Sequence, residues 1–316
     1  MKYLLLIIIS TLSLSFYGQI KDEHKIPHKS YSDSLYENTT SETIAWLKAK
    51  SDTLNQLIDK YSKLIEQNSK DDKAYYMRAN AKEKLIGYLK EDNYTEHGKK
   101  VKIICQDEIN DLTEVTKLNS KYADTAYFKI YGVKQRMWIS NRDSAVKSTY
   151  YLEKAVALNP KYTIAWFCLA NLYYNNDKRA IECYTKVIEL KDTLLAISAY
   201  QRRAQCKRNL KDYKGALADL TNATKVHRVH FNFYNIYFDR GLIKYEIQDY
   251  KGAIEDYTKT IDLVPKNTTY YYYRGDAKLK VGDKQGACLD WDKAKDKEMI
   301  DRKLVNVTDT INKYCK

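Results

Sequence analysis

Histidine and cysteine, the residues that most often carry chemistry, show no arrangement in this sequence that is typical of an active site or a metal centre. There are five histidines and six cysteines. His227 and His230 could share one face of a helix, as metal-ligating histidines do, but no Asp, Glu or Cys adjoins them. The sequence contains no G-x-S-x-G, H-E-x-x-H or paired Cys–His signature. It therefore predicts no catalytic residue, no metal site and no cofactor.

Glycine and proline are too scarce for a phosphate-binding loop or for a fold of many short strands. The 316 residues include 10 Gly and 3 Pro, whereas an average protein has about 12% of these two residues together. Neither G-x-G-x-x-G nor G-x-x-x-x-G-K-[ST] occurs. Hairpin turns need Gly or Asn at fixed positions. The composition thus predicts an all-α protein.

Residues 1–18 are typical of a secretory signal peptide. Lys2 precedes an apolar stretch that begins at Tyr3, and small and polar residues follow as far as Gly18. The apolar stretch is short for a membrane span. No cysteine follows it before Cys105, which disfavours a lipid anchor. We expect export to the periplasm or the extracellular space of a Gram-negative cell, with no integral membrane segment after cleavage; an uncleaved anchor is the alternative. Residues 19–40 are predicted to be a polar linker.

Export would permit disulfides, but the positions of the cysteines favour free thiols. They lie inside helical patterns without regular spacing, at Cys105, Cys168, Cys183, Cys206, Cys288 and Cys315. In such patterns cysteine behaves as a small buried hydrophobic residue. We expect mostly free, buried thiols, with Cys168–Cys183 as the best candidate for a disulfide.

A repeat of 34 residues organises the chain. In the last two units Gly241 and Gly275 follow an arginine and are 34 residues apart, and Ala204 holds the same place one unit earlier. Twelve residues later each unit has a second small residue, Ala216, Ala253 or Ala287, followed by a large one, Leu220, Tyr257 or Trp291. Two helices cross closely only where side chains are small. Each unit is therefore predicted to be a pair of helices that cross at these positions.

This pattern resembles the tetratricopeptide repeat (TPR), a helix–turn–helix unit of 34 residues. The match is strong in the last two units, and it persists upstream in units with small residues at Ala170, Gly132, Ala79 and Ala45. The resemblance implies a right-handed superhelical solenoid of about seven helical hairpins over residues 41–300. Apolar residues then recur at three- and four-residue steps from Ile300 to Tyr314. Residues 301–316 are therefore predicted to form an amphipathic helix that caps the last unit.

The resemblance also implies a concave groove, lined by the first helix of each unit, that binds a peptide or a partner protein. The family's groove positions, carried over unit by unit, give these candidate ligand-binding residues: Tyr76, Asn80, Lys129, Arg136, Phe167, Asn171, Tyr174, Gln201, Arg208, Phe238, Tyr245 and Tyr272. Aromatic side chains beside Asn, Gln and Arg suit peptide binding. The alternative is that some of these rings only pack between adjacent units.

Charge narrows the class of partner. Lys and Arg number 54 against 41 Asp and Glu, so the formal net charge is +13 and an acidic protein or peptide partner is attractive on long-range grounds. Acidic residues are interleaved along the chain, which disfavours nucleic acid as a partner. We expect a non-catalytic interaction scaffold of the cell envelope. A component of an envelope assembly or secretion machine is the alternative, and an enzyme or a nucleic-acid-binding protein is disfavoured.

Overall fold

The computed structural model describes residues 41–89, 94–137, 145–226, 233–295, 299–300, 303–304 and 307–315. The expected signal peptide (1–18), the expected linker (19–40), His227 and His230 lie outside the described residues. The elements are α3 (Ser41–Gln67), α4 (Asp72–Ile86), α5 (Tyr94–Lys117), α6 (Ala123–Met137), α7 (Ala145–Leu158), α8 (Thr163–Leu172), α9 (Asp177–Glu189), α10 (Ala196–Asn209), α11 (Tyr213–Lys225), α12 (Tyr234–Glu246), α13 (Tyr250–Leu263), α14 (Thr268–Lys280), α15 (Lys284–Ala294), β1 (Met299–Ile300), β2 (Lys303–Leu304) and α16 (Val307–Tyr314).

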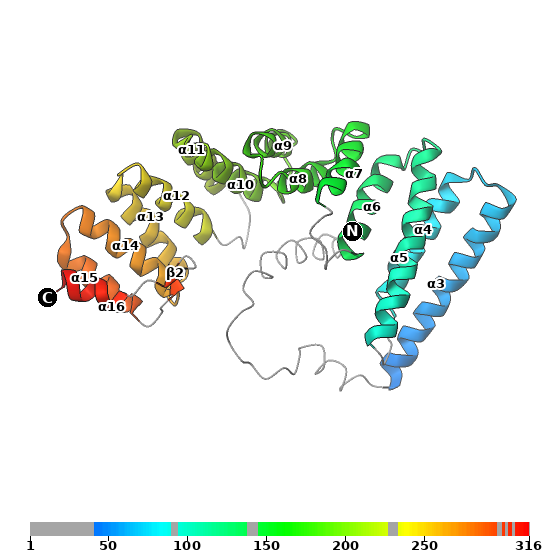
Figure 1. The fold of residues 1–316 in the computed structure, drawn as a ribbon, viewed down its shortest axis with the longest axis horizontal. Coiled ribbons are helices and arrows are strands. Elements are labelled where there is room, and N and C mark those ends of the chain that lie inside the picture. The colour runs from blue at the N-terminus through cyan, green and yellow to red at the C-terminus, as the bar shows by residue number, and fades with distance from the viewer. Residues whose placement is uncertain are drawn as a thin grey trace.

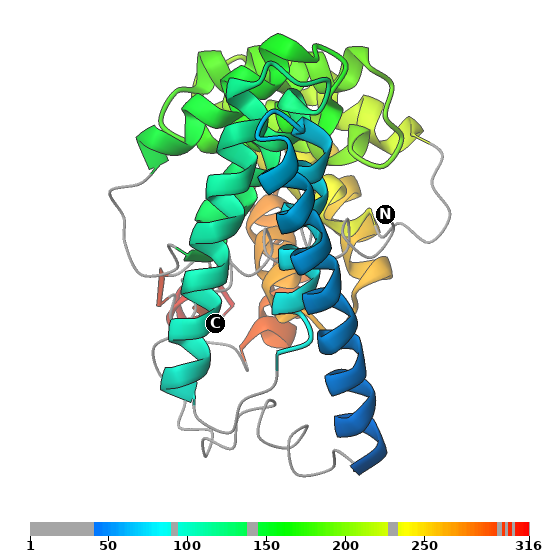
Figure 2. The ribbon, with the colours of Figure 1, turned by 90° about the vertical axis from the view of Figure 1, so that its right-hand side faces the viewer.

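Each helix packs against the next one along the chain, so the protein is a row of helix pairs. The pairs are α4–α5, α6–α7, α8–α9, α10–α11, α12–α13 and α14–α15. Figure 1 shows them side by side in an arch, with α8 and α10 beneath α9 and α11 on its inner side. Figure 2 looks at the end of the row where α3 and α5 lie at the front. The predicted all-α solenoid is confirmed.

The first predicted hairpin is wrong, because α3 is one continuous helix of 27 residues. Its segment contains no Gly or Pro that could start a turn. Its apolar side packs through Leu54, Leu57 and Ile58 on Ala81 and Leu85 of α4. Within the described ranges the row therefore consists of one single helix followed by six pairs, in place of about seven hairpins.

Small residues are needed where the two helices of a pair cross. A Cβ atom added to Gly241 would lie 2.6 Å from the Tyr257 ring, and one added to Gly275 would lie 2.7 Å from Trp291. Gly132 differs, since an added Cβ there would meet nothing within 4 Å. Gly132 is therefore not at a crossing, and the alignment of its unit is wrong. That unit has buried Ala126, Ile130 and Val133 on α6 in place of the usual small residue.

A repeated ion network also joins the helices of four pairs. Arg240 donates from Nε and Nη2 to the two carboxylate oxygens of Asp256 at 2.8 and 2.5 Å, and Lys244 lies 2.9 Å from the same carboxylate. The equivalent trios are Arg78–Asp111–Lys82, Arg203–Asp219–Lys207 and Arg274–Asp290–Lys278. Each aspartate is almost fully buried. A buried carboxylate that accepts hydrogen bonds from two cations has its charge compensated. Because the geometry of these bonds is specific, they fix how the two helices of the pair align along their lengths.

The C-terminal segment differs from the prediction in two ways. The helix α16 begins at Val307, and the strands β1 and β2 pair Met299 with Leu304 where one helix over 301–316 was expected. Four of the six cysteines are free, as expected, but a disulfide joins Cys288 of α15 to Cys315. The candidate pair Cys168–Cys183 is wrong, since both residues are free. The disulfide and the contacts of Val307 and Tyr314 with the Trp291 cluster hold α16 against the last pair.

Candidate protein-interaction face

The first helices of the pairs (α4, α6, α8, α10, α12 and α14) present one continuous surface, here called the concave face. Contacts between successive first helices define it. Gln201 of α10 donates to Asp239 of α12 at 2.6 Å, and Phe238 of α12 lies 4.9 Å, centroid to centroid, from Tyr270 of α14. All twelve predicted groove residues lie on these helices or directly after them. That their side chains form one binding surface stays a prediction.

Several predicted groove aromatics pack within a helix pair or between adjacent pairs. Phe167 is buried and meets Tyr184 edge-on, with the centroids 5.8 Å apart. Phe238 contacts three tyrosines of α13 and α14. Tyr76 stacks on Tyr122, which precedes α6, at 4.6 Å. For these three residues the packing alternative is the better interpretation.

Other aromatics on this face stay open to solvent. Tyr174, directly after α8, is 70% exposed. Tyr245 is half-buried edge-on to Tyr250, and Tyr272 is half-buried edge-on to Tyr273. These three rings keep surface that a partner could cover.

The cations among the predicted groove residues are already paired. Lys129 of α6 forms an ion pair with Glu83 of α4. Arg136 lies 3.0 Å from Glu108 of α5 and 3.6 Å from Glu83. Arg208 of α10 donates through Nε to Glu246 at 2.9 Å. These pairs join successive helix pairs, so their charges are largely neutralised within the array.

Three carboxyl groups lie on or beside this face, Glu108 buried and Asp276 and Asp239 half-buried, and loss of solvent raises the pKa of each. The pKa of Glu108 rises to about 7 mainly because the group is desolvated, although Arg136 opposes the shift, and its Oε1 has no hydrogen-bond partner in the structure. Burial likewise raises the pKa of Asp276 to about 6, and burial raises the pKa of Asp239. The groove positions transferred from the TPR family did not include Glu108 or Asp239. Glu108 lies three residues before Asp111, where the other pairs have the second small residue, such as Ala216. Asp239 lies one residue beyond a family groove position.

At two helix crossings an aromatic residue of the second helix donates a hydrogen bond to a polar residue of the first helix, which the sequence pattern did not predict. Tyr184 of α9 reaches past the crossing and donates to Asn171 of its own pair at 2.6 Å. In the same register Trp291 of α15 donates to Asp276 at 3.1 Å. Tyr257 of α13 faces Leu242 at this position, and its buried hydroxyl has no partner in the structure.

Known structures share this architecture. Comparison with solved structures finds the C-terminal part of a TPR repeat-containing protein from Cytophaga hutchinsonii, at 16% identity and a TM-score of 0.53, covering 84% of this chain and 98% of that one. This chain folds as a TPR array. MamA matches at 21% identity and a TM-score of 0.49 over 61% of this chain and 96% of that chain. YrrB, described as a TPR protein with an unusual peptide-binding site, matches at 16% and 0.49 over 58% of this chain and 91% of that chain. No protein-family profile and no curated protein matches the sequence.

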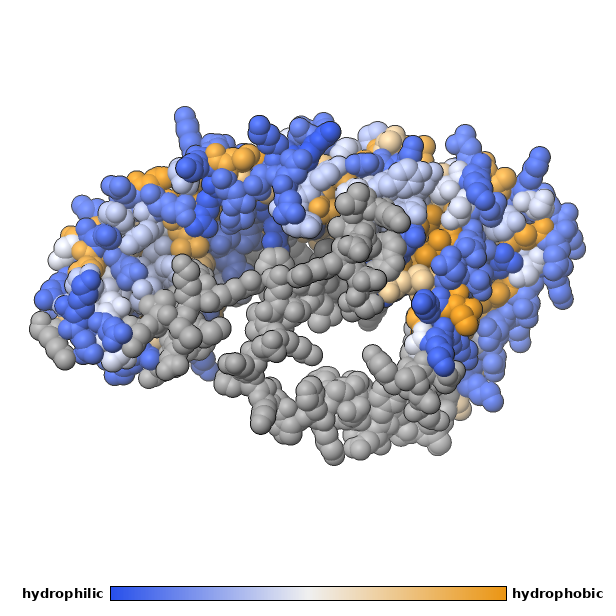
Figure 3. Space-filling model, viewed as in Figure 1, coloured by the Kyte–Doolittle hydropathy of each residue, from blue (hydrophilic) through white to orange (hydrophobic). Residues whose placement is uncertain are grey.

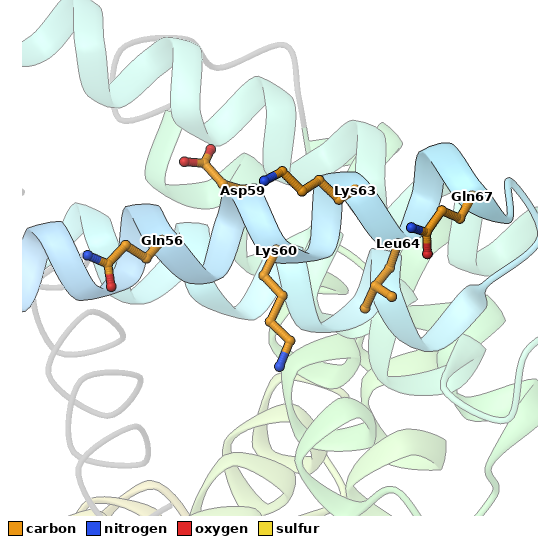
Figure 4. Close-up of a pocket in the computed structure, with 6 residues that line it drawn as sticks. All are labelled: Gln56, Asp59, Lys60, Lys63, Leu64 and Gln67. Atoms are coloured by element: carbon orange, nitrogen blue, oxygen red, sulfur yellow. The ribbon is translucent and has the colours of Figure 1, made fainter.

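Beyond the concave face, the described part of the TPR array offers little that resembles a chemical site. A shallow pocket of about 450 Å³ lies on α3 and is lined by Gln56, Asp59, Lys60, Lys63, Leu64 and Gln67. Figure 4 shows that these side chains spread around one helix and do not converge. Among the described residues no three His, Cys, Asp or Glu side chains gather as metal ligands would, and none of the described helices combines the length and apolar character of a membrane span.

Proposed function

We propose that this TPR array is a non-catalytic scaffold that binds a peptide or a partner protein on its concave face. The observation that carries the proposal is the contrast among the aromatic residues of that face. The rings of Phe167 and Phe238 pack against other aromatic residues of the fold, whereas Tyr174, in the turn after α8, is 70% exposed. Exposed tyrosine on a rigid helical frame is typical of interaction hot spots.

The surface around these residues suits selective protein binding. Where Figure 3 shows the described residues, hydrophobic and hydrophilic residues are interspersed, and hydrophobic ones gather toward the right-hand end. Asn80, Asn171 and Gln201 lie half-buried on the concave face and add amide groups to it. A peptide that lies across such a face gains aromatic contact and amide hydrogen bonds together.

We further propose that the protein is exported to the cell envelope. The signal-like character of residues 1–18 supports this. The Cys288–Cys315 disulfide adds independent support, because disulfides persist in oxidising compartments such as the periplasm. A role within an envelope assembly or secretion machine is a specialised form of the same function.

The sign of the partner's charge does not follow from the basic net charge. Lys129, Arg136 and Arg208 are each paired with a carboxylate. An acidic partner would have to displace those ion pairs, so these cations give little reason to expect one. The same pairing argues against nucleic acid, which needs free Lys and Arg for its phosphates.

Affinity capture from envelope extract tests the proposal. The full chain should retain a defined protein that a Tyr174→Ala, Tyr245→Ala double variant retains poorly. The matched control is Tyr150→Ala, since Tyr150 is a half-exposed tyrosine on α7, a second helix. Equal retention by the wild type and the double variant, or equal loss with Tyr150→Ala, would overturn the assignment of the concave face. Signal removal is checked by the mass of the mature protein from the periplasmic fraction.

A further inference from the structure

In the C-terminal half of the concave face, two half-buried carboxyl groups form no ion pair among the described residues. In the described part of the chain Asp276 of α14 takes part in no ion pair, and its hydrogen-bond donors are the Trp291 indole and the Tyr272 hydroxyl. Asp239 of α12 receives a hydrogen bond from Gln201 at 2.6 Å. The aspartates of the ion network, such as Asp256 and Asp290, each have an Arg and a Lys. Asp276 and Asp239, which are half-buried, therefore differ from the fully buried aspartates of the ion network.

Nearby cations do not complete these groups. Arg208 and Arg202 attract Asp239 without forming an ion pair with it, and Arg208 is engaged by Glu246. Lys278 is engaged by Asp290. Lys280 acts on Asp276 only at longer range and is itself exposed. A carboxylate can accept about four hydrogen bonds, so Asp276 keeps acceptor capacity that its two neutral donors do not fill.

A second, independent feature lies beside Asp276. The hydroxyl of Tyr257 is fully buried and has no hydrogen-bond partner among the described residues, and the groups that act on it include Tyr245, Asp276 and Arg208. Leaving a buried hydroxyl unpaired costs about 1 to 3 kcal/mol. A donor that arrives at Asp276 would therefore find a further acceptor in Tyr257. The rings of Tyr245 and Tyr272 are half-buried at the same place.

We infer that Asp276, Tyr245, Tyr257 and Tyr272 form a subsite for a basic side chain, arginine or lysine, of the bound protein segment, with Asp239 as a second acidic contact along the face. This inference rests on the proposed peptide-binding function, and it adds that the bound segment contains a basic side chain. Its groups are hydrogen-bond acceptors and aromatic faces, which suit a guanidinium or an ammonium group. An acidic side chain would meet an uncompensated carboxylate there.

The test measures binding of three labelled short peptides, in which glycine alternates with arginine, glutamate or glutamine, by fluorescence anisotropy at near-physiological salt. The net charge of +13 favours the glutamate peptide non-specifically. Tighter binding of the arginine peptide would therefore run against the long-range attraction of the net charge. It would indicate a local acidic site. We expect the arginine peptide to bind at least about tenfold more tightly than the glutamine peptide, as a charge-assisted hydrogen bond provides.

Two variants assign the effect to the subsite. Asp276→Asn should lower the affinity for the arginine peptide about tenfold, and it retains an oxygen that can accept from Trp291. Asp292→Asn is the matched control, because Asp292 of α15 is exposed and paired with Lys295. Tyr257→Phe should weaken arginine binding without lowering the melting temperature, which separates a contact with the ligand from a role in folding.

Acidification gives a further readout. Asp276 is faced by Tyr245 of α12, Tyr257 of α13, and Tyr272 and Lys280 of its own helix, and its pKa is raised to about 6. Because only the carboxylate attracts a cation, affinity for the arginine peptide should fall as the pH is lowered through about 6, and Asp276→Asn should abolish that dependence.

The subsite is wrong if the arginine peptide binds no more tightly than the glutamine peptide, or if Asp276→Asn leaves its affinity unchanged. Tight binding of the glutamate or glutamine peptide that is lost in Tyr174→Ala would also overturn the subsite, but it would leave the peptide-binding function standing.

Discussion

At the scale of single residues, the polar side chains beside the helix crossings differ in whether they form a hydrogen bond. Tyr184 and Trp291 each donate to a polar residue of their own pair, Asn171 and Asp276. Tyr257 meets Leu242 in the same register and has no partner in the structure. Three chemically similar positions therefore have different energetic roles, which tyrosine-to-phenylalanine substitutions can measure.

Removing the two hydroxyls should have opposite consequences for stability. Tyr184→Phe should lower the free energy of unfolding by about 1 kcal/mol, because a short hydrogen bond is lost and Asn171 keeps an unpaired acceptor. Tyr257→Phe should leave stability unchanged or raise it by up to about 1 kcal/mol, since an unpaired buried hydroxyl is removed. Urea unfolding of both variants measures the difference. Equal destabilisation by the two substitutions would show that the Tyr257 hydroxyl has a partner in solution.

Glu108 should make stability depend on pH. Its pKa is about 7 in the folded protein against an ordinary value of 4.5, because burial disfavours the charged form. The native state therefore holds a proton that the unfolded state has released, and stability should fall as the pH rises from about 4.5 to about 7, by up to about 3 kcal/mol.

Unfolding at pH 5 and pH 8 checks this prediction. Glu108→Gln should flatten the dependence, whereas Glu114→Gln, at an exposed residue of the same helix, should leave it unchanged. A wild-type protein that is more stable at pH 8 than at pH 5, with Glu108→Gln behaving identically, would contradict the assignment.

At the scale of helices and pairs, the residues that pattern reasoning could find are those with a steric role repeated in each unit. Gly241 and Gly275 were predictable because a side chain there would enter the Tyr257 or Trp291 ring. The continuous helix α3 and the register around Gly132 were not predictable from spacing. In both places the small residues of the sequence do not correspond to a helix crossing.

The ion network and the disulfide show a second limit. Arginine precedes the small residue in the repeats, and an aspartate follows 16 residues later in three pairs, yet only the fold shows that the two side chains meet. Cys288 and Cys315 are 27 residues apart, and they meet because α16 returns to α15. Likewise, only the structure shows that the carboxyl groups of Asp239 and Asp276 form no ion pair among the described residues.

The disulfide should stabilise the C-terminal end of the array. Closing a loop of this length stabilises a protein by about 3 to 4 kcal/mol in the chain-entropy estimate. Reduction, or Cys315→Ser, should therefore increase amide hydrogen exchange in α16 and α15 and leave exchange in α8 and α9 unchanged. The control is Cys206→Ser, at a free cysteine of α10. Unchanged exchange in α16 after reduction would show that the packing of Val307 and Tyr314 is sufficient.

At the scale of the whole molecule, the array divides its two sets of helices between different tasks. The first helices contain the half-buried Tyr245 and Tyr272 and the acidic residues Asp239 and Asp276, and the exposed Tyr174 lies in the turn after α8. The second helices supply the large residues that fill the crossings, such as Leu220, Tyr257 and Trp291. Side chains on the first helices can therefore change with the partner while the second helices maintain the fold.

The most direct test of this account is amide hydrogen exchange of the full chain with and without the partner obtained by affinity capture. Binding on the concave face predicts new protection in α8, α10, α12 and α14, strongest near Tyr174 and Asp276, with α9, α11, α13 and α15 changed little. Protection confined to those second helices, or to α3 and its pocket, would contradict the central claim that the first helices form the binding surface.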